Sequence, residues 1–242
     1  EGYVVGRKSS KIALRKGAAD VARGQLYTRM LKDVFKASKG GSSELSANFL
    51  LKVAIEKAKK FNVPRDHIEK AIKKGQGGEG AGYQDISYEG YGPNGVAFFV
   101  EVSTDNPTRT VANIRSSFKK CNGALGTAGS LEFVSSHKAQ FEIIAEGINE
   151  EDFTLHMIEA GADDVELDEG YYVVTGPKEA FGAIQEKLQE IHITPEEASL
   201  IRIPNSKKEV DAETLVQIEK LLDLLESDDD VVTVYLNLEN DI

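Results

Sequence analysis

The chain of 242 residues contains one cysteine, Cys121, and no tryptophan. A single cysteine excludes an internal disulfide bond and a zinc finger built on cysteines. No apolar run approaches the roughly 18 residues that a membrane-spanning helix needs, and no stretch near the start has the charged and then apolar pattern of a secretory signal. Hydrophobic residues still make up 40% of the chain, so we expect a soluble protein with a substantial core.

The formal net charge of −11 is distributed unevenly along the chain. Residues 1–80 contain 18 Lys and Arg against 8 Asp and Glu, a balance of +10, and the remaining 162 residues contain 11 against 32, a balance of −21. A basic segment attracts polyanions, whereas an acidic segment repels them. The first third therefore indicates a nucleic-acid partner, unless the split is a chance bias of the surface.

The basic third has the apolar spacing of short helices. One helix is expected around residues 27–39 and ends at Gly40-Gly41. A second begins near Ser46, and a third runs from Pro64 to Gly75. Residues 75–82 contain five glycines and predict a flexible linker, because they follow a helix and lack the Gly-Lys-Ser/Thr ending of a phosphate loop.

Strand and helix patterns alternate after the linker, as in α/β domains. Residues 137–204 have the order strand, helix, two strands, helix and strand, which is the ferredoxin-like pattern. Residues 81–136 and 205–242 together supply a second, similar layer. We therefore predict the α+β class: an N-terminal three-helix domain with its linker over residues 1–80, followed by two ferredoxin-like α/β domains, with the domain at 137–204 inserted in the other.

Within the outer α/β domain we expect strands at 96–102 and 131–134. The residues from Tyr88 to Asn94 include two tyrosines, two glycines and a proline, which predict a loop before the first strand. Glycines allow a backbone to approach a phosphate and tyrosines can stack on bases. The alternative is a structural turn with Tyr88 and Tyr91 packed between domains.

Five motifs occur in order along the chain and resemble those of one known family, and the resemblance runs from about Ile12 to Glu239. They are Arg15-Lys16-Gly17-Ala18-Ala19-Asp20 with Arg23-Gly24, Val63-Pro64-Arg65-Asp66 with Ile68-Glu69-Lys70-Ala71-Ile72-Lys73, Tyr88-Glu89-Gly90-Tyr91-Gly92-Pro93, Asp105-Asn106-Pro107-Thr108-Arg109-Thr110-Val111-Ala112, and Gly123-Ala124-Leu125-Gly126. The chain is thereby similar to the YebC/PmpR family of bacteria, which is related to the mitochondrial translational activator of cytochrome c oxidase. It departs from that family at Gly6-Arg7-Lys8-Ser9-Ser10, where members typically have Gly-His-Ser-Lys-Trp.

The resemblance implies a three-domain α/β protein without enzymatic activity. Bacterial relatives are described as probable transcriptional regulators that bind DNA, and mitochondrial relatives activate translation. Bacterial members have also been linked to ribosomes that stall at proline runs. The resemblance therefore implies either a DNA-binding transcription factor or an RNA-binding translation factor.

The predicted nucleic-acid-binding residues lie mainly on the basic helices, where they neutralise phosphates and release counterions. Tyr88 and Tyr91 are included for stacking. Arg109 is included because the first turn of a helix attracts anions, although an acidic neighbour would also suit it. The basic residues of the first third are Arg15, Lys16, Arg23, Arg29, Lys32, Lys36, Lys59, Lys60, Arg65 and Lys73.

The sequence favours a non-enzymatic regulator that binds nucleic acid, either DNA or ribosomal RNA. Lysine-rich faces contact the backbone rather than the bases, which favours the shape of structured RNA. The acidic domains are expected to meet the ribosome or another protein. We expect no membrane partner, and cytoplasm is the expected location, or an organellar matrix if a targeting segment preceded Glu1.

Two other classes of function remain open from the sequence. One is a small-molecule-sensing module, since paired ferredoxin-like layers often hold ligands between them. The other is an enzyme that uses Cys121, but a buried or incidental thiol explains that residue better. No cofactor or metal is expected, because the four histidines are scattered and have no metal-ligand spacing.

Overall fold

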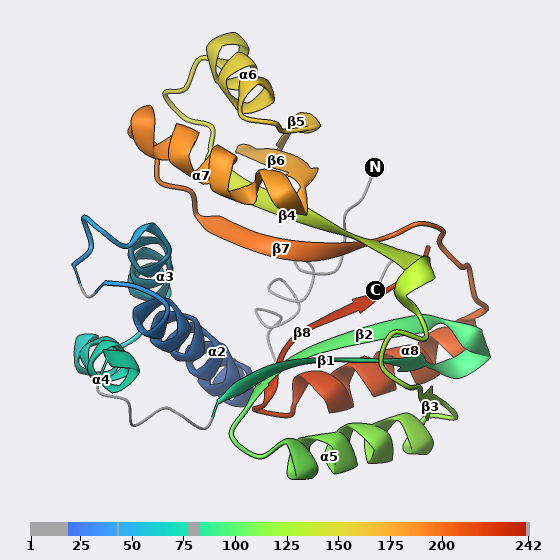
Figure 1. Ribbon diagram of the computed structural model, residues 1–242. Coiled ribbons are helices and arrows are strands. Elements are labelled where there is room, and N and C mark those ends of the chain that lie inside the picture. Colours follow the sequence, from blue (N-terminus) through green and yellow to red (C-terminus); the bar gives the residue numbers. More distant parts are fainter. Residues whose placement is uncertain (1–18, 43, 77–82, 241–242) are drawn as a thin grey trace. The chain divides into compact units, whose positions relative to one another are not determined.

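The computed structural model describes residues 19–42, 44–76 and 83–240, with the side chains of the first helix described from Leu26 onward (Figure 1). The described chain divides into two compact units. Unit 1 combines Glu1–Lys32, Gly77–Ser136 and Ile203–Ile242, and unit 2 combines Asp33–Gln76 with His137–Arg202. Each unit therefore contains segments that are distant in the sequence.

Three helices occupy the basic third, as predicted. They are α2 (Ala19–Lys39), α3 (Phe49–Lys60) and α4 (Arg65–Gln76). Helix α3 begins three residues later than expected because the side chain of Asn48 accepts a hydrogen bond from the N–H of Leu51 and caps the helix. Helix α2 belongs to unit 1 up to Lys32 and to unit 2 beyond it.

The sheet of unit 2 has the predicted ferredoxin-like element order. Its strands lie in the order β5-β6-β4-β7, and β6 pairs antiparallel with both β4 and β5. Alternate residues of β4, Ala139, Phe141 and Ile143, are buried in one core with residues of both helices. The elements are β4 (Ser135–Ile144), α6 (Glu150–Glu159), β5 (Asp164–Asp168), β6 (Tyr171–Pro177), η3 (Lys178–Ala180), α7 (Phe181–Glu190) and β7 (Glu197–Pro204).

Helix α3 shares this core, because Phe49 and Val53 belong to the same buried cluster as the strands of unit 2. Both side chains are only 7% exposed. A short basic helix with one apolar face has little stability by itself. Packing on the acidic sheet domain supplies the burial that α3 needs.

The sheet of unit 1 has the order β3-β1-β2-β8, and helices α5 and α8 lie on the same side of it (Figure 1). Phe98 and Val100 of β2 are fully buried with Phe118 of α5 and Ile218 of α8. The α+β class predicted from the sequence is confirmed. The elements are β1 (Gln84–Tyr91), η1 (Pro93–Gly95), β2 (Ala97–Thr104), α5 (Pro107–Lys120), β3 (Ala124–Leu125), η2 (Glu132–Val134), α8 (Ala212–Glu226) and β8 (Val231–Leu236).

Two local predictions in unit 1 were wrong. The residues from Tyr88 to Tyr91 are not a loop but the end of strand β1, where Tyr88 pairs with Val100 of β2. The segment at 131–134 is not a strand but contains the 3₁₀ turn η2. Leu131 and Val134 are apolar because they pack with Phe99 on the face of the sheet opposite α5 and α8.

The last turns of α2 and α4 are in close contact within unit 2. Ser38 is 1% exposed and its hydroxyl donates a hydrogen bond of 2.8 Å to the carbonyl oxygen of Ile72. A Cβ atom placed on Gly75 would lie 2.7 Å from the carbonyl oxygen of Phe35 and 2.9 Å from the Cβ of Ser38. Only glycine permits this approach without a backbone shift.

We expect Gly75→Ala to destabilise the protein by about 1–3 kcal/mol, because overpacking against the backbone outweighs the better helix propensity of alanine. Gly182→Ala is the matched control, because Gly182 of α7 has open space around its Cβ position. That control should be neutral or up to about 1 kcal/mol more stable. Urea unfolding measures both changes, and a Gly75→Ala protein as stable as the parent would contradict the tight packing.

Candidate nucleic-acid interface

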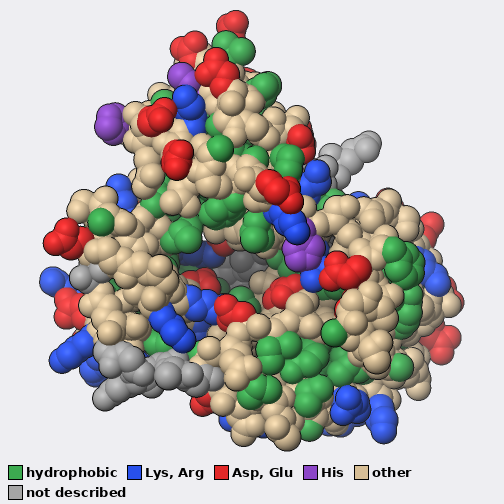
Figure 2. Space-filling view, in the orientation of Figure 1, with side chains coloured by type: hydrophobic (Ala, Val, Ile, Leu, Met, Phe, Trp, Pro, Cys, Tyr) green, Lys and Arg blue, Asp and Glu red, His purple; other side chains and the backbone are tan. Residues whose placement is uncertain are grey.

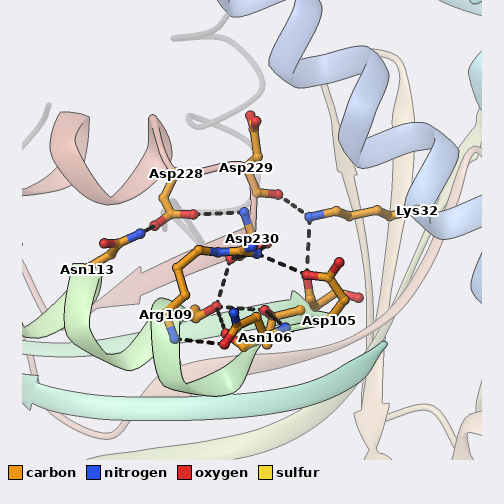
Figure 3. Close-up of polar contacts among 11 residues, drawn as sticks. Lys32, Asp105, Asn106, Arg109, Asn113, Asp228, Asp229 and Asp230 are labelled. Carbon is orange, nitrogen blue, oxygen red and sulfur yellow. Dashed lines mark hydrogen bonds and ion pairs between the residues drawn. The ribbon is translucent and has the colours of Figure 1, made fainter. Parts of the chain in front are cut away.

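Arg29 and Lys32 lie against the turn between α8 and β8 in unit 1. The Nη2 atom of Arg29 donates a hydrogen bond of 2.8 Å to the carbonyl oxygen of Glu226, the last residue of α8. Lys32 Nζ donates to the carbonyl oxygens of Ser103, at 3.2 Å, and Asp229 (Figure 3). The carbonyl group of Glu226 ends a helix, so it lacks a helical partner and carries partial negative charge that favours a cation. The acceptors of Lys32 lie in strand β2 and in the turn after α8. Together these hydrogen bonds hold the part of α2 up to Lys32 within unit 1.

Arg109 is paired with carboxylates of unit 1. Its Nη2 atom lies 2.9 Å from Asp230 Oδ2 and 3.0 Å from Asp105 Oδ1 (Figure 3). Thr110 Oγ1 donates a further hydrogen bond of 2.7 Å to Asp230 Oδ2. The sequence left two partners open for Arg109, a phosphate and an acidic neighbour. The structure shows the acidic neighbour.

Asp230 is buried, and burial by itself would raise the pKa of its carboxyl group. The hydrogen bonds from Arg109 and Thr110 outweigh burial and lower that pKa below its ordinary value. The lowered pKa means that the folded state favours the charged form of Asp230. This carboxylate therefore stabilises unit 1 at neutral pH.

The two predicted stacking residues differ in exposure. Tyr88 is partly buried against the core of unit 1, and burial raises the pKa of its phenol. Tyr91 ends β1 with 43% of its surface exposed. Tyr88 packs on the core of one unit from a strand, not from a turn, and Tyr91 is the more exposed of the pair.

Two lysines of α3 are paired with carboxylates at the start of β7. Lys60 Nζ lies 2.5 Å from Glu196, and Lys57 is hydrogen-bonded to Glu197. Burial by itself would lower the pKa of Lys57, but the carboxylates of Glu197 and Asp33 raise it above its ordinary value. Lys57 therefore stays charged and binds α3 to the sheet domain of unit 2.

Arg65 is paired within its own helix but remains open to solvent. Its Nε atom lies 2.7 Å from Glu69 Oε1, and 89% of its side chain is exposed. Exposed pairs of this kind contribute about 0–1 kcal/mol and are easily exchanged. Arg65 is thus available to a phosphate in a way that Lys57 is not.

Four exposed lysines of helices α2 to α4 have no carboxylate within ion-pair distance in the described ranges: Lys39, Lys59, Lys73 and Lys74. Three of them form what we call the α2–α4 corner: Lys39, Lys73 and Lys74. They flank the contact between Ser38 and Ile72, so the two lysine-bearing helix ends meet. Figure 2 shows Lys and Arg side chains over α4.

Lys39 and Lys74 were not among the residues selected from the sequence. The signal that could have found them is position, because lysines occupy the last turns of α2 and α4. Positive charge at a helix C-terminus is also favourable for structural reasons, so position alone does not identify a binding lysine. What the sequence did not reveal is that the two helix ends lie together.

Other predicted residues are less informative. Lys36 is half-buried on α2. Arg23 lies within α2, but its side chain is outside the described set, and Arg15 and Lys16 lie outside the described residues, as does the glycine-rich stretch at 77–82. The corner with Lys59 and Arg65 is therefore the basic surface that the structure defines.

Charge is also divided inside unit 2. Residues 33–76 contain 10 Lys and Arg against 5 Asp and Glu, a balance of +5. Residues 137–202 contain 4 against 16, a balance of −12. A polyanion that approaches unit 2 is consequently attracted by the helices and repelled by the sheet domain.

No group of three or more His, Cys, Asp or Glu that could hold a metal occurs among the described residues, and no described helix is long and apolar enough to cross a membrane. Cys121 is 2% exposed in the core of unit 1, and burial raises the pKa of its thiol. A nucleophilic cysteine needs a lowered pKa instead.

The fold and the basic helices define a class: an α+β protein with three lysine-rich helices and two separate sheet layers. Comparison with known families identifies the family to which the chain belongs. Residues 7–78 match the TACO1/YebC protein N-terminal domain and residues 83–238 match the TACO1/YebC second and third domain. The chain therefore belongs to the TACO1/YebC family.

Similar proteins cover nearly the whole chain. A probable transcriptional regulatory protein of Syntrophotalea carbinolica is 42% identical over 234 residues, 96% of this chain and 94% of its own length. One of Treponema denticola is 42% identical over 233 residues, with the same shares. The crystal structure of a conserved hypothetical protein from Aquifex aeolicus has a TM-score of 0.75 and 34% identity, and covers 93% of this chain and 96% of its own.

We expect Asp230→Asn to destabilise the protein by about 1–2 kcal/mol at pH 7, because it removes a charge-assisted hydrogen bond to a half-exposed arginine. A carboxyl with a lowered folded-state pKa contributes stability at neutral pH and loses it as pH falls. The difference between the variant and the parent should thus shrink as pH drops below 3.8, the ordinary pKa of aspartate, and through the lower folded value.

Urea unfolding at several pH values measures this difference. Asp105→Asn is the matched control, since Asp105 pairs with the same arginine but is 53% exposed. We expect that control to cost less than about 1 kcal/mol. If the loss of unfolding free energy caused by Asp230→Asn stayed constant down to low pH, the role of the charged pair would be contradicted.

Proposed function

We propose that this protein is a non-enzymatic regulator of gene expression that binds the phosphate backbone of a nucleic acid through the α2–α4 corner. The observation that carries the proposal is the contact between the ends of α2 and α4, which bear Lys39, Lys73 and Lys74 and where no described carboxylate pairs with these lysines. Lysines placed together repel one another, and a polyphosphate removes that repulsion and releases counterions. Lys59 and Arg65 extend the same basic helices.

The names of the relatives support a regulatory role. The proteins of Syntrophotalea carbinolica and Treponema denticola are both called probable transcriptional regulatory proteins. Regulation of transcription requires no chemistry on a substrate, which agrees with the buried thiol of Cys121. The bacterial origin of these relatives supports cytoplasm as the place of action.

We propose further that the target is structured RNA, as in a ribosome, rather than a specific DNA sequence. The corner consists of lysines, which act as point charges on phosphates and lack the planar fork with which arginine reads guanine. Shape and backbone recognition of this kind is typical of folded RNA. A promoter-binding protein needs side chains that read base edges.

The triple variant Lys39→Glu, Lys73→Glu and Lys74→Glu should weaken binding to an RNA hairpin at least tenfold, or roughly 1.4 kcal/mol. The slope of the logarithm of affinity against the logarithm of salt concentration should also become shallower by about 2–3, since each phosphate contact contributes about 0.9. Fluorescence anisotropy over a range of salt concentrations measures both quantities. A duplex DNA of equal length tests the preference for RNA.

The matched control is Lys119→Glu, Lys120→Glu and Lys220→Glu in unit 1. These lysines are exposed, and Lys119 and Lys120 occupy the last turn of α5 just as Lys73 and Lys74 occupy that of α4. The control therefore has the same change in net charge and a similar effect on a helix end. Equal loss of affinity in both variants would mean that net charge alone, and not the corner, binds RNA.

Crosslinking in cells followed by sequencing of RNA and DNA separates the two nucleic acids. Recovery of ribosomal RNA supports the proposal. Recovery of promoter DNA without RNA would contradict the RNA target and would indicate that the same basic surface binds DNA in transcription.

A further inference from the structure

Helix α6 of unit 2 has two apolar faces. Phe153 and Met157 point inward and are 2% and 0% exposed. Leu155 and Ile158 lie on the outward side, with 55% and 53% of their surfaces exposed. At 3.6 residues per turn, an ordinary surface helix has polar residues at these positions.

A third exposed aliphatic residue lies on the neighbouring strand. Helix α6 contacts β5, where Leu167 is 52% exposed. Single exposed aliphatic residues are common and need no explanation. Three on two adjoining elements form an apolar surface, and we call this surface the α6 face: Leu155, Ile158 and Leu167.

Carboxylates surround the α6 face, and Figure 2 shows acidic side chains beside hydrophobic ones over α6. Glu150, Glu151 and Asp152 occupy the first turn, where they stabilise the helix N-terminus and so need no partner. Glu159 is different, because a negative charge in the last turn opposes the helix dipole. Asp164, an exposed acidic residue of β5, also has no helix end to stabilise.

We propose that the α6 face docks a cationic amphipathic segment of another protein. Apolar side chains of the partner would cover Leu155 and Ile158, and its lysines or arginines would meet the surrounding carboxylates. The charge of the sheet domain selects this occupant, because residues 137–202 have a balance of −12. That field repels nucleic acids, anionic membranes and a second copy of the same domain.

The proposal is independent of the nucleic-acid role. The α6 face and the α2–α4 corner belong to segments of opposite charge within unit 2. Two binding surfaces of opposite sign allow one protein to meet an RNA and a basic protein at the same time. Ribonucleoprotein particles contain both RNA and basic proteins.

A defined peptide tests the α6 face on the full-length chain. The probe is a labelled 14-residue helix of alternating lysine and leucine faces, and its comparison peptide replaces every leucine with serine at unchanged charge. Binding is measured by anisotropy and mapped by backbone amide chemical shifts. We expect shifts in residues 150–168 and at least tenfold weaker binding of the serine peptide, since apolar contact is required.

Leu155→Ser with Ile158→Ser should weaken binding of the leucine peptide at least tenfold. Val216→Ser is the matched control, because Val216 is a 65% exposed aliphatic residue on α8. That variant and the triple corner variant should bind the leucine peptide as the parent does. The chemical-shift map of the parent protein keeps the test valid even if the double variant is poorly folded.

Three outcomes would overturn the proposal. Equal binding of the two peptides would show attraction by charge alone. Shifts confined to other elements would place the apolar contact elsewhere. Concentration-dependent dimerisation that Leu155→Ser with Ile158→Ser abolishes would identify a second copy as the occupant.

Discussion

The ion pair between Arg109 and Asp230 fixes the turn of unit 1 that holds the part of α2 up to Lys32. It joins the first turn of α5 to the turn between α8 and β8, and Thr110 strengthens it from the same helix. With that turn held, its carbonyl oxygens point to α2 and accept hydrogen bonds from Arg29 and Lys32. Two basic residues are thereby used for assembly of unit 1.

Much of the fold could be predicted because the local signals agree with the tertiary structure. Asn106 and Asp211 cap helices where Asx residues precede apolar repeats, and the ferredoxin-like order of unit 2 follows from strands and helices of ordinary length. Strand β1 was missed because Tyr88 to Pro93 has the composition of a turn. Its strand conformation comes from pairing with β2, which composition alone does not reveal.

The candidate binding residues were harder to predict. The charge of a side chain indicates the charge of its partner, but it does not indicate which groups lie near that side chain in the folded protein. Lys32 bonds to Asp229, which lies 197 positions later in the chain, and Lys60 bonds to Glu196, 136 positions later. No helical periodicity marks those contacts. The sequence correctly located excess positive charge in the first third, yet only coordinates separate lysines that hold the fold from lysines such as Lys73 that face solvent.

Charges of opposite sign lie side by side in the sequence segments of unit 2, with basic helices at 33–76 and an acidic sheet domain at 137–202. Lys57 and Lys60 attach α3 to that domain, so its acidic residues neutralise these two lysines, whereas Lys39, Lys73 and Lys74 at the ends of α2 and α4 stay exposed. The most direct test is ultraviolet crosslinking of the full-length protein to an RNA hairpin, with crosslinked peptides identified by mass spectrometry. Crosslinks to peptides that contain residues 36–76 are the predicted result, and crosslinks confined to the acidic segment 137–202 would contradict the central claim.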